Sequence, residues 1–271
     1  MKAHIASLVL ISLFTAASHA GVVIEFVNRN ADTGKEEPLQ SMWVQNGMAR
    51  MESARNREAV TIFRDDALNI VNANTKTYQV MDKATLDQAM GVMDDAMAKM
   101  RERMAALPPD QRAMMEQMMK QRGGAMMNGG NAPQKPVAYD AQPTGGGDTV
   151  NGRSCKLWNI TRDGVPSQQV CVVPLSALGG ADEVIALSKK MSALFEKFGE
   201  RMRDQMGSSL PQTSGSLTKI GGYPIMSRAY RDGQLAKEAF VVKTWSQKTI
   251  EPAKFEIPAG YTKQEMPKMP K

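Results

Sequence analysis

Catalytic side chains are scarce in this 271-residue sequence, because its two histidines, His4 and His19, both fall within the first twenty residues. Those residues have the pattern of an export signal, so we expect the mature chain to contain no histidine. Ser-His-Asp and Cys-His triads, His-based zinc sites and imidazole acid–base catalysis are then excluded. No Gly-x-Ser-x-Gly, P-loop or Gly-x-Gly-x-x-Gly motif stands between a strand and a helix. The sequence therefore predicts no catalytic residue, no cofactor and no enzymatic activity.

Methionine is the unusual residue type, and eleven of the 22 methionines lie between Met90 and Met127. The first five recur at helical intervals of three and four residues: Met90, Met93, Met97, Met100 and Met104. Thioether side chains are flexible and polarisable, so such a stripe can adapt to an irregular apolar surface. Three interpretations stay open: packing of a helix on a sheet, a site or lid for an apolar ligand, or capture of Cu(I) by Met93, Met97 and Met100. Copper is disfavoured because no histidine or cysteine is near the stripe, and no other metal site is predicted.

The two cysteines, Cys155 and Cys171, flank Asp163-Gly164 in a predicted hairpin. A three-residue loop, Arg162 to Gly164, would place the cysteines directly opposite each other. A two-residue turn would instead leave the two side chains on opposite faces of the sheet. We predict the three-residue loop and a structural disulfide, because an exported protein is exposed to oxidising conditions. A redox-active pair is disfavoured because there is no Cys-x-x-Cys motif.

Residues 1–20 predict a cleavable signal, with Lys2 before an apolar stretch and small residues up to Ala20, where we expect the cut. No later stretch is apolar and long enough for a transmembrane span. The mature chain should be exported, and periplasmic in a cell with two membranes. It carries 33 Lys and Arg against 28 Asp and Glu. This surplus favours acidic surfaces, such as a membrane surface, only weakly, and without a basic helix it does not indicate nucleic acid.

Alternation of apolar and polar residues predicts an antiparallel meander of strands at 22–26, 42–44, 48–52, 60–63, 68–71 and 77–80. The period then becomes helical, and Thr85 to Gln88 has the spacing of a capping box. We predict a helical hairpin over 85–122, divided at Pro108, and a mobile Gly- and Pro-rich loop over 123–147.

Strands resume at Val150 in the second half of the chain, and a third helix is predicted over 182–206. Its apolar stripe contains Val184, Leu187, Met191, Leu194, Phe198 and Met202, with Ile185 and Phe195 beside it. The last strands, 223–231 and 234–245, are joined through Asp232-Gly233. Strands and helices in segregated runs favour an antiparallel α+β domain over alternating βαβ units.

The layout resembles the LolA/LolB-like superfamily of exported lipoprotein carriers, and more closely an uncharacterised exported bacterial branch of that group, a DUF-type domain. The likeness rests on four segments: 42–51 with Trp43 and Arg50, 75–78, 150–158 and 255–261. The resemblance implies one domain over 21–263, an open antiparallel half-barrel with helices over its concave face. Residues 83–147 would be an inserted Met-rich hairpin and loop, and 264–271 a tail. Relatives hold the acyl chains of lipoproteins in an apolar cavity, and Arg50 matches an arginine implicated in their function.

We therefore predict an exported, non-enzymatic protein that binds a lipid, an acyl chain or another apolar ligand, or a lipidated or hydrophobic partner, in the cell envelope. The alternatives are a Cu(I)-handling protein and an assembly partner without a small ligand. The residues expected to line or cover the apolar site are Met90, Met93, Met97, Met100, Met104, Leu194, Phe195, Phe198 and Arg50.

Overall fold

The computed structural model describes residues 20–112, 114, 138–206 and 220–265. The first half of the chain forms β1 (Gly21–Asn30), β2 (Glu36–Gln45), β3 (Met48–Ser53), β4 (Ala59–Arg64), β5 (Ala67–Asn72), β6 (Thr77–Met81) and helix α1 (Lys83–Ala105). The second half forms β7 (Tyr139–Val150), β8 (Arg153–Arg162), β9 (Val165–Pro174), a 3-10 turn η1 (Leu175–Ala177) and helix α3 (Ala181–Met206). The chain continues with β10 (Gly222–Arg231), β11 (Gln234–Lys248), a 3-10 turn η2 (Pro252–Phe255) and β12 (Thr262–Lys263).

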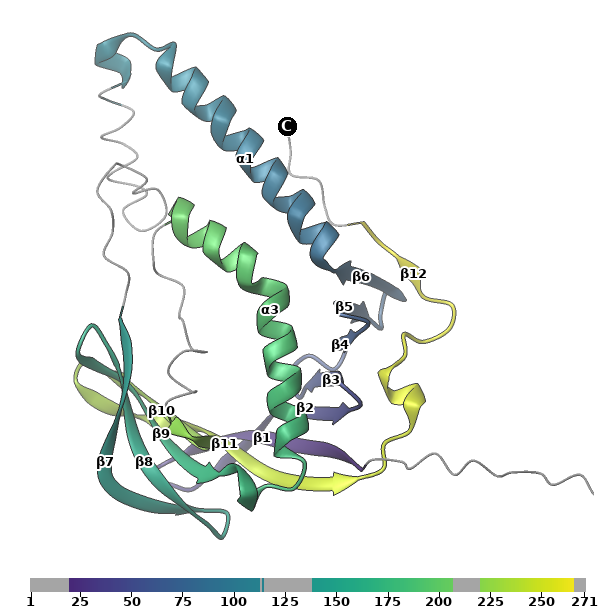
Figure 1. The fold of residues 1–271 in the computed structure, drawn as a ribbon, viewed down its shortest axis with the longest axis vertical. Coiled ribbons are helices and arrows are strands. Elements are labelled where there is room, and N and C mark those ends of the chain that lie inside the picture. Colours follow the sequence, from purple (N-terminus) through teal and green to yellow (C-terminus); the bar gives the residue numbers. More distant parts are fainter. Residues whose placement is uncertain (1–19, 113, 115–137, 207–219, 266–271) are drawn as a thin grey trace, which may run out of the picture.

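All described strands belong to one twelve-stranded sheet with the order β12-β6-β5-β4-β3-β2-β1-β11-β10-β9-β8-β7. Every pairing is antiparallel except that of β12 with β6. The sheet is curved and open, and α1 and α3 lie on its inner side (Figure 1). This architecture confirms the predicted α+β class and agrees with an open half-barrel.

Five pairs of neighbouring strands are joined by two-residue turns whose backbone has positive φ at both positions. A turn of this kind matches the twist of the strands and favours Asn, Asp and Gly, which tolerate the left-handed region. The turns are Asn46-Gly47, Asp65-Asp66, Asn151-Gly152, Asp163-Gly164 and Asp232-Gly233. The local sequence therefore determines these turns, and the meander of the first half of the chain, β1 to β6, is as predicted.

The two meanders are joined by β1 and β11, which pair from Gly21 with Lys248 to Asn30 with Glu238. The largest apolar cluster lies along this seam and contains Val22, Ile24, Val241 and Val242, each at most 2% exposed. Bringing together two strands so far apart in sequence has the greatest entropic cost of loop closure. Burial of a large apolar area is needed to offset that cost.

Helix α1 begins at Asp82 rather than at the capping box that the spacing of Thr85 to Gln88 predicts. The Asp82 carboxylate accepts hydrogen bonds from the backbone N–H of Thr85 at 2.8 Å and from its hydroxyl at 2.6 Å. These hydrogen bonds lower the pKa of Asp82. An aspartate at this position satisfies otherwise unpaired amides of the first turn, so the helix starts two residues earlier than expected.

The outer apolar face of the first meander is covered by the C-terminal segment, residues 251–263. Phe255 is fully buried beside Val23 and Ile250, with Trp43 packed against them. Farther along the segment, apolar side chains pack on β4, β5 and β6: Ile257 and Tyr261 against Val60, Ile62, Val71 and Tyr78. A sheet of this length needs cover on both faces, and here the helices supply one and the chain end the other.

One strand of the second half differs from the sequence predictions. Residues 139–147, predicted as loop, belong to β7, which accommodates its Gly-rich stretch as a bulge between Pro143 and Gly147. The first helix of the predicted hairpin is confirmed, and a new helical turn starts near Pro109. Most of the second helix and the loop up to residue 137 lie outside the described residues, as do residues 1–19 of the predicted signal.

The expected Cys155–Cys171 disulfide is present, with Cα atoms 5.4 Å apart. The predicted three-residue loop is wrong, because Arg162 pairs with Val165 across a two-residue turn. Just beyond this turn the register between β8 and β9 shifts by one residue. Leu157 is therefore opposite Cys171, and Cys155 is diagonal to Cys171. This bulge returns both cysteines to the same face of the hairpin, where both are buried in the main core. The disulfide indicates an extracytoplasmic protein.

Replacing both cysteines by alanine should lower the free energy of unfolding by about 3 kcal/mol, the value for closing a loop of this size. Urea unfolding followed by circular dichroism measures the difference. The wild-type protein unfolded under reducing conditions is the matched control and should behave like the double variant. Equal stability of variant and oxidised wild type, or two free thiols in exported protein, would contradict the structural role.

Candidate functional site

The first turns of α3 occupy the inner face of the sheet over β1 and β2. Ala181, Val184 and Leu187 are buried in the same cluster as Val22 and Ile24. The helix then rises away from the sheet toward α1 (Figure 1). Any space for an apolar ligand on the helical side therefore lies farther from the seam, at the outer halves of α1 and α3.

Among the described residues, the buried side chains of α1 lie in its first two turns. The helix contacts β6 and α3, and its buried side chains in the described part are those of Leu86 and Met90. The next four methionines of the stripe are half-buried: Met93, Met97, Met100 and Met104. Val92, on another side of the helix, is 44% exposed. The stripe is thus the inward-facing side of α1, and the described residues cover it incompletely.

Two predicted residues of α3, Leu194 and Phe195, are both half-buried. Leu194 packs against the main core together with Met191. Phe198 lies on the same helix, but its side chain falls outside the described part of the chain. The structure therefore places the methionine stripe and the end of the α3 stripe on two helices that contact each other.

Arg50 lies apart from this helical pair. It is opposite Trp43 and Ile62 in the register of β3, so it shares the face covered by the C-terminal segment. Its guanidinium donates to the Glu52 carboxylate at 2.6 Å and to the backbone carbonyl of Lys254 at 3.2 Å. The Lys254 ammonium nitrogen, Nζ, in turn lies 4.1 Å from the centre of the Trp43 ring. Arg50 holds the C-terminal segment against the sheet in this structure.

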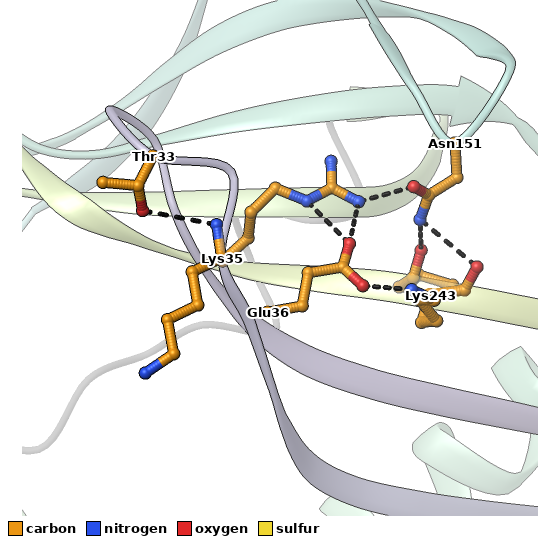
Figure 2. Close-up of polar contacts among 7 residues, drawn as sticks. Thr33, Lys35, Glu36, Asn151 and Lys243 are labelled. Atoms are coloured by element: carbon orange, nitrogen blue, oxygen red, sulfur yellow. Dashed lines mark hydrogen bonds and ion pairs between the residues drawn. The ribbon is translucent and has the colours of Figure 1, made fainter.

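Sequence reasoning missed a charged network at the far end of the seam. The Glu36 carboxylate lies between Arg29 and Lys243, and Arg29 also contacts Asn151. Figure 2 shows Glu36 beside Lys243, with Asn151 nearby. Arg29 donates to Glu36 Oε1 at 2.9 Å through Nε and at 2.6 Å through Nη2, and Lys243 pairs with the other carboxylate oxygen. The Lys243 hydrogen bond, followed by that of Arg29, lowers the pKa of Glu36.

The network ties the β7–β8 turn to the seam. The Asn151 amide donates to the backbone carbonyl of Val242 at 2.8 Å and accepts from Arg29, while the neighbouring Val150 is buried in the main core. In strand order β7 and β8 are the strands farthest from β1 on their side, so these contacts show that the sheet curls back on itself. No local sequence signal could find this site, because two of its bonded members, Glu36 and Lys243, are 207 residues apart.

The described residues contain no helix that is both long and apolar enough to cross a membrane. They also contain no cluster of three or more His, Cys, Asp or Glu placed to hold a metal ion.

No protein-family model matches this sequence, and no curated protein matches it. Among solved structures, an uncharacterized conserved protein from Thermus thermophilus has a TM-score of 0.39 and 6% identity, over 92% of this chain and 91% of that one. MucB in the Pseudomonas aeruginosa MucA/MucB complex has a TM-score of 0.34 and 12% identity, over 90% of this chain and 56% of that one. This chain thus spans little more than half of MucB. Likenesses at this level fix neither family nor function, and the LolA/LolB-like resemblance stays a prediction.

Protonation of Glu36 should weaken the network and with it the folded state. A carboxylate whose folded pKa is lowered stabilises the fold above its unfolded pKa, and that contribution is lost as pH falls through the folded pKa. We therefore expect Glu36→Gln to be less stable than wild type at pH 7 and the difference to shrink as the pH falls below 4.5, the ordinary value for Glu.

Urea unfolding of both proteins across this pH range measures the effect. Glu37→Gln is the matched control, since Glu37 is exposed and pairs with Lys35 at 3.1 Å, and exposed ion pairs contribute little. A Glu36→Gln difference that stays constant with pH would show that the carboxylate charge does not stabilise the fold.

Proposed function

We propose that this chain is a non-enzymatic binding protein of the cell envelope that holds an acyl chain against the methionine stripe of α1, where that helix meets α3. The observation that carries the proposal is the incomplete burial of Met93, Met97, Met100 and Met104 beyond the buried first turns of α1. Apolar side chains that face inward without full cover favour an apolar occupant.

The chemistry of the stripe also supports an acyl chain. Unbranched thioether side chains adapt to a flexible hydrocarbon, and each buried methylene contributes about 0.8 kcal/mol. Ten buried methylenes would contribute about 8 kcal/mol before ordering costs, which allows micromolar binding. An exported chain meets lipids and lipidated proteins in the envelope, which fits the compartment that the disulfide indicates.

Replacing Met93, Met97 and Met100 together by leucine should leave acyl binding within about threefold of wild type, because leucine keeps the apolar volume. Replacing the same three residues by serine should weaken binding by about tenfold or more, because polar side chains remove the apolar contact. Titration with a sixteen-carbon fatty acid carrying an environment-sensitive fluorophore measures both. Val92→Ser, on an exposed side of the same helix, is the control and should change nothing.

The same variants separate the acyl proposal from copper handling. Cu(I) titration against a competing chelator should show no tight site, and tight copper binding that the leucine variant loses would favour copper instead. Failure of the wild-type protein to bind the fluorescent fatty acid, together with no lipid in native mass spectra of gently extracted protein, would overturn the proposal. A hydrophobic protein partner without a small ligand would then remain.

A further inference from the structure

The outer half of helix α1, residues 95–105, projects away from the sheet (Figure 1). Among the side chains of this stretch that the structure describes, those of Met97, Met100 and Met104 are partly buried and all the others are exposed. We name these three the outer methionines. The described side chains through which the outer half of α1 packs are therefore all thioethers. Leucine would supply a similar apolar contact, so packing alone does not require sulfur at all three positions.

The outer methionines differ in exposure from other methionines of the chain. Met114 is 68% exposed, whereas Met90 and Met226 are each 9% exposed. A solvent-accessible thioether is open to two-electron oxidation, and a covered one is protected. The cysteines are joined in a disulfide, so the described residues offer no thiol that would react first. That disulfide also indicates a compartment outside the thiol systems that keep the cytosol reduced.

We propose that the outer methionines are a site of reversible oxidation by hydrogen peroxide, and that their oxidation releases the outer half of α1 from the rest of the fold. The sulfur lone pair attacks one peroxide oxygen, so that an S–O bond forms, the O–O bond breaks and the second oxygen leaves as hydroxide. Transfer of the S–OH proton to this hydroxide gives the sulfoxide and water. Sulfur is oxidised by two electrons, and the peroxide is reduced by two. Methionine sulfoxide reductases reverse the change.

Release follows from the polarity of the product. A sulfoxide oxygen accepts hydrogen bonds, and burying it in an apolar contact without a donor costs free energy. The outer methionines recur at intervals of three and four residues on one face of the helix, so their sulfoxides act on the same contact. A detached helical stretch shorter than about 12–15 residues is marginal in water. The outer half of α1 should therefore fray, while Leu86 and Met90 keep the first turns buried.

Peptide mapping by mass spectrometry tests the modification site, using the full mature protein treated with increasing hydrogen peroxide. Met114 should gain an oxygen atom first, the outer methionines next, and Met90 and Met226 last. Outer methionines that react no faster than Met90 and Met226, in protein whose Met114 is already fully oxidised, would overturn the proposal.

Amide hydrogen exchange of the same samples tests the release. After oxidation of the outer methionines, the amides of residues 98–105 should exchange about tenfold faster or more, because local opening then costs less free energy. The amides of β1 and β11 should exchange as before. Unchanged exchange of residues 98–105 in protein whose outer methionines are fully oxidised would contradict the release.

The combined variant Met97→Leu, Met100→Leu and Met104→Leu keeps the apolar volume and removes the sulfur. Its exchange should match that of untreated wild type both before and after peroxide, and faster exchange after peroxide would overturn the assignment to these residues. Met114→Leu is the matched control and should respond to peroxide as wild type does. Neither measurement uses an acyl chain, so the outcome is independent of the proposed acyl site.

Discussion

The pairing of β1 with β11 is the interaction on which the rest of this structure depends. It joins residues near the two ends of the described chain, Gly21 with Lys248, and places two independent meanders in one sheet. Without this pairing, the apolar residues of β2 and β10 would not belong to one core. Helix α3 would then have no continuous sheet surface on which to pack. The largest buried cluster follows this seam, because hydrophobic burial must offset the entropy of a closure of that length.

The two faces of the sheet are covered by different means, and this division separates the candidate sites. On the inner side, α3 fills the region over the seam, and α1 extends beyond it with a partly covered methionine stripe. On the other face, Phe255 and the residues after it cover the first meander, and Arg50 holds that segment by hydrogen bonding. Arg50, which the family resemblance suggested as a functional residue, thus makes a structural contact in this chain.

The bulges explain why charged residues gather at one place on the seam. A regular ladder would place Glu36, Lys243 and Asn151 in separate environments. The extra residues in β2 and β11 bend the strands, and the curl of β7 and β8 brings Asn151 back onto β11. The resulting hydrogen bonds from Lys243 and Arg29 lower the pKa of Glu36, whose side chain is 21% exposed.

The sequence by itself determined the meander of the first half, the positions of α1 and α3 to within a few residues and the α+β class, because turn residues such as Asn-Gly and the change of period act over a few residues. It also determined that the cysteines would pair, although a bulge rather than a longer loop gives the pairing. Only the tertiary structure decided the seam, the face on which Arg50 lies, the strand over 139–147 and the charged network around Glu36. These depend on long-range register and on which elements cover each face, and short-range periodicity does not encode either.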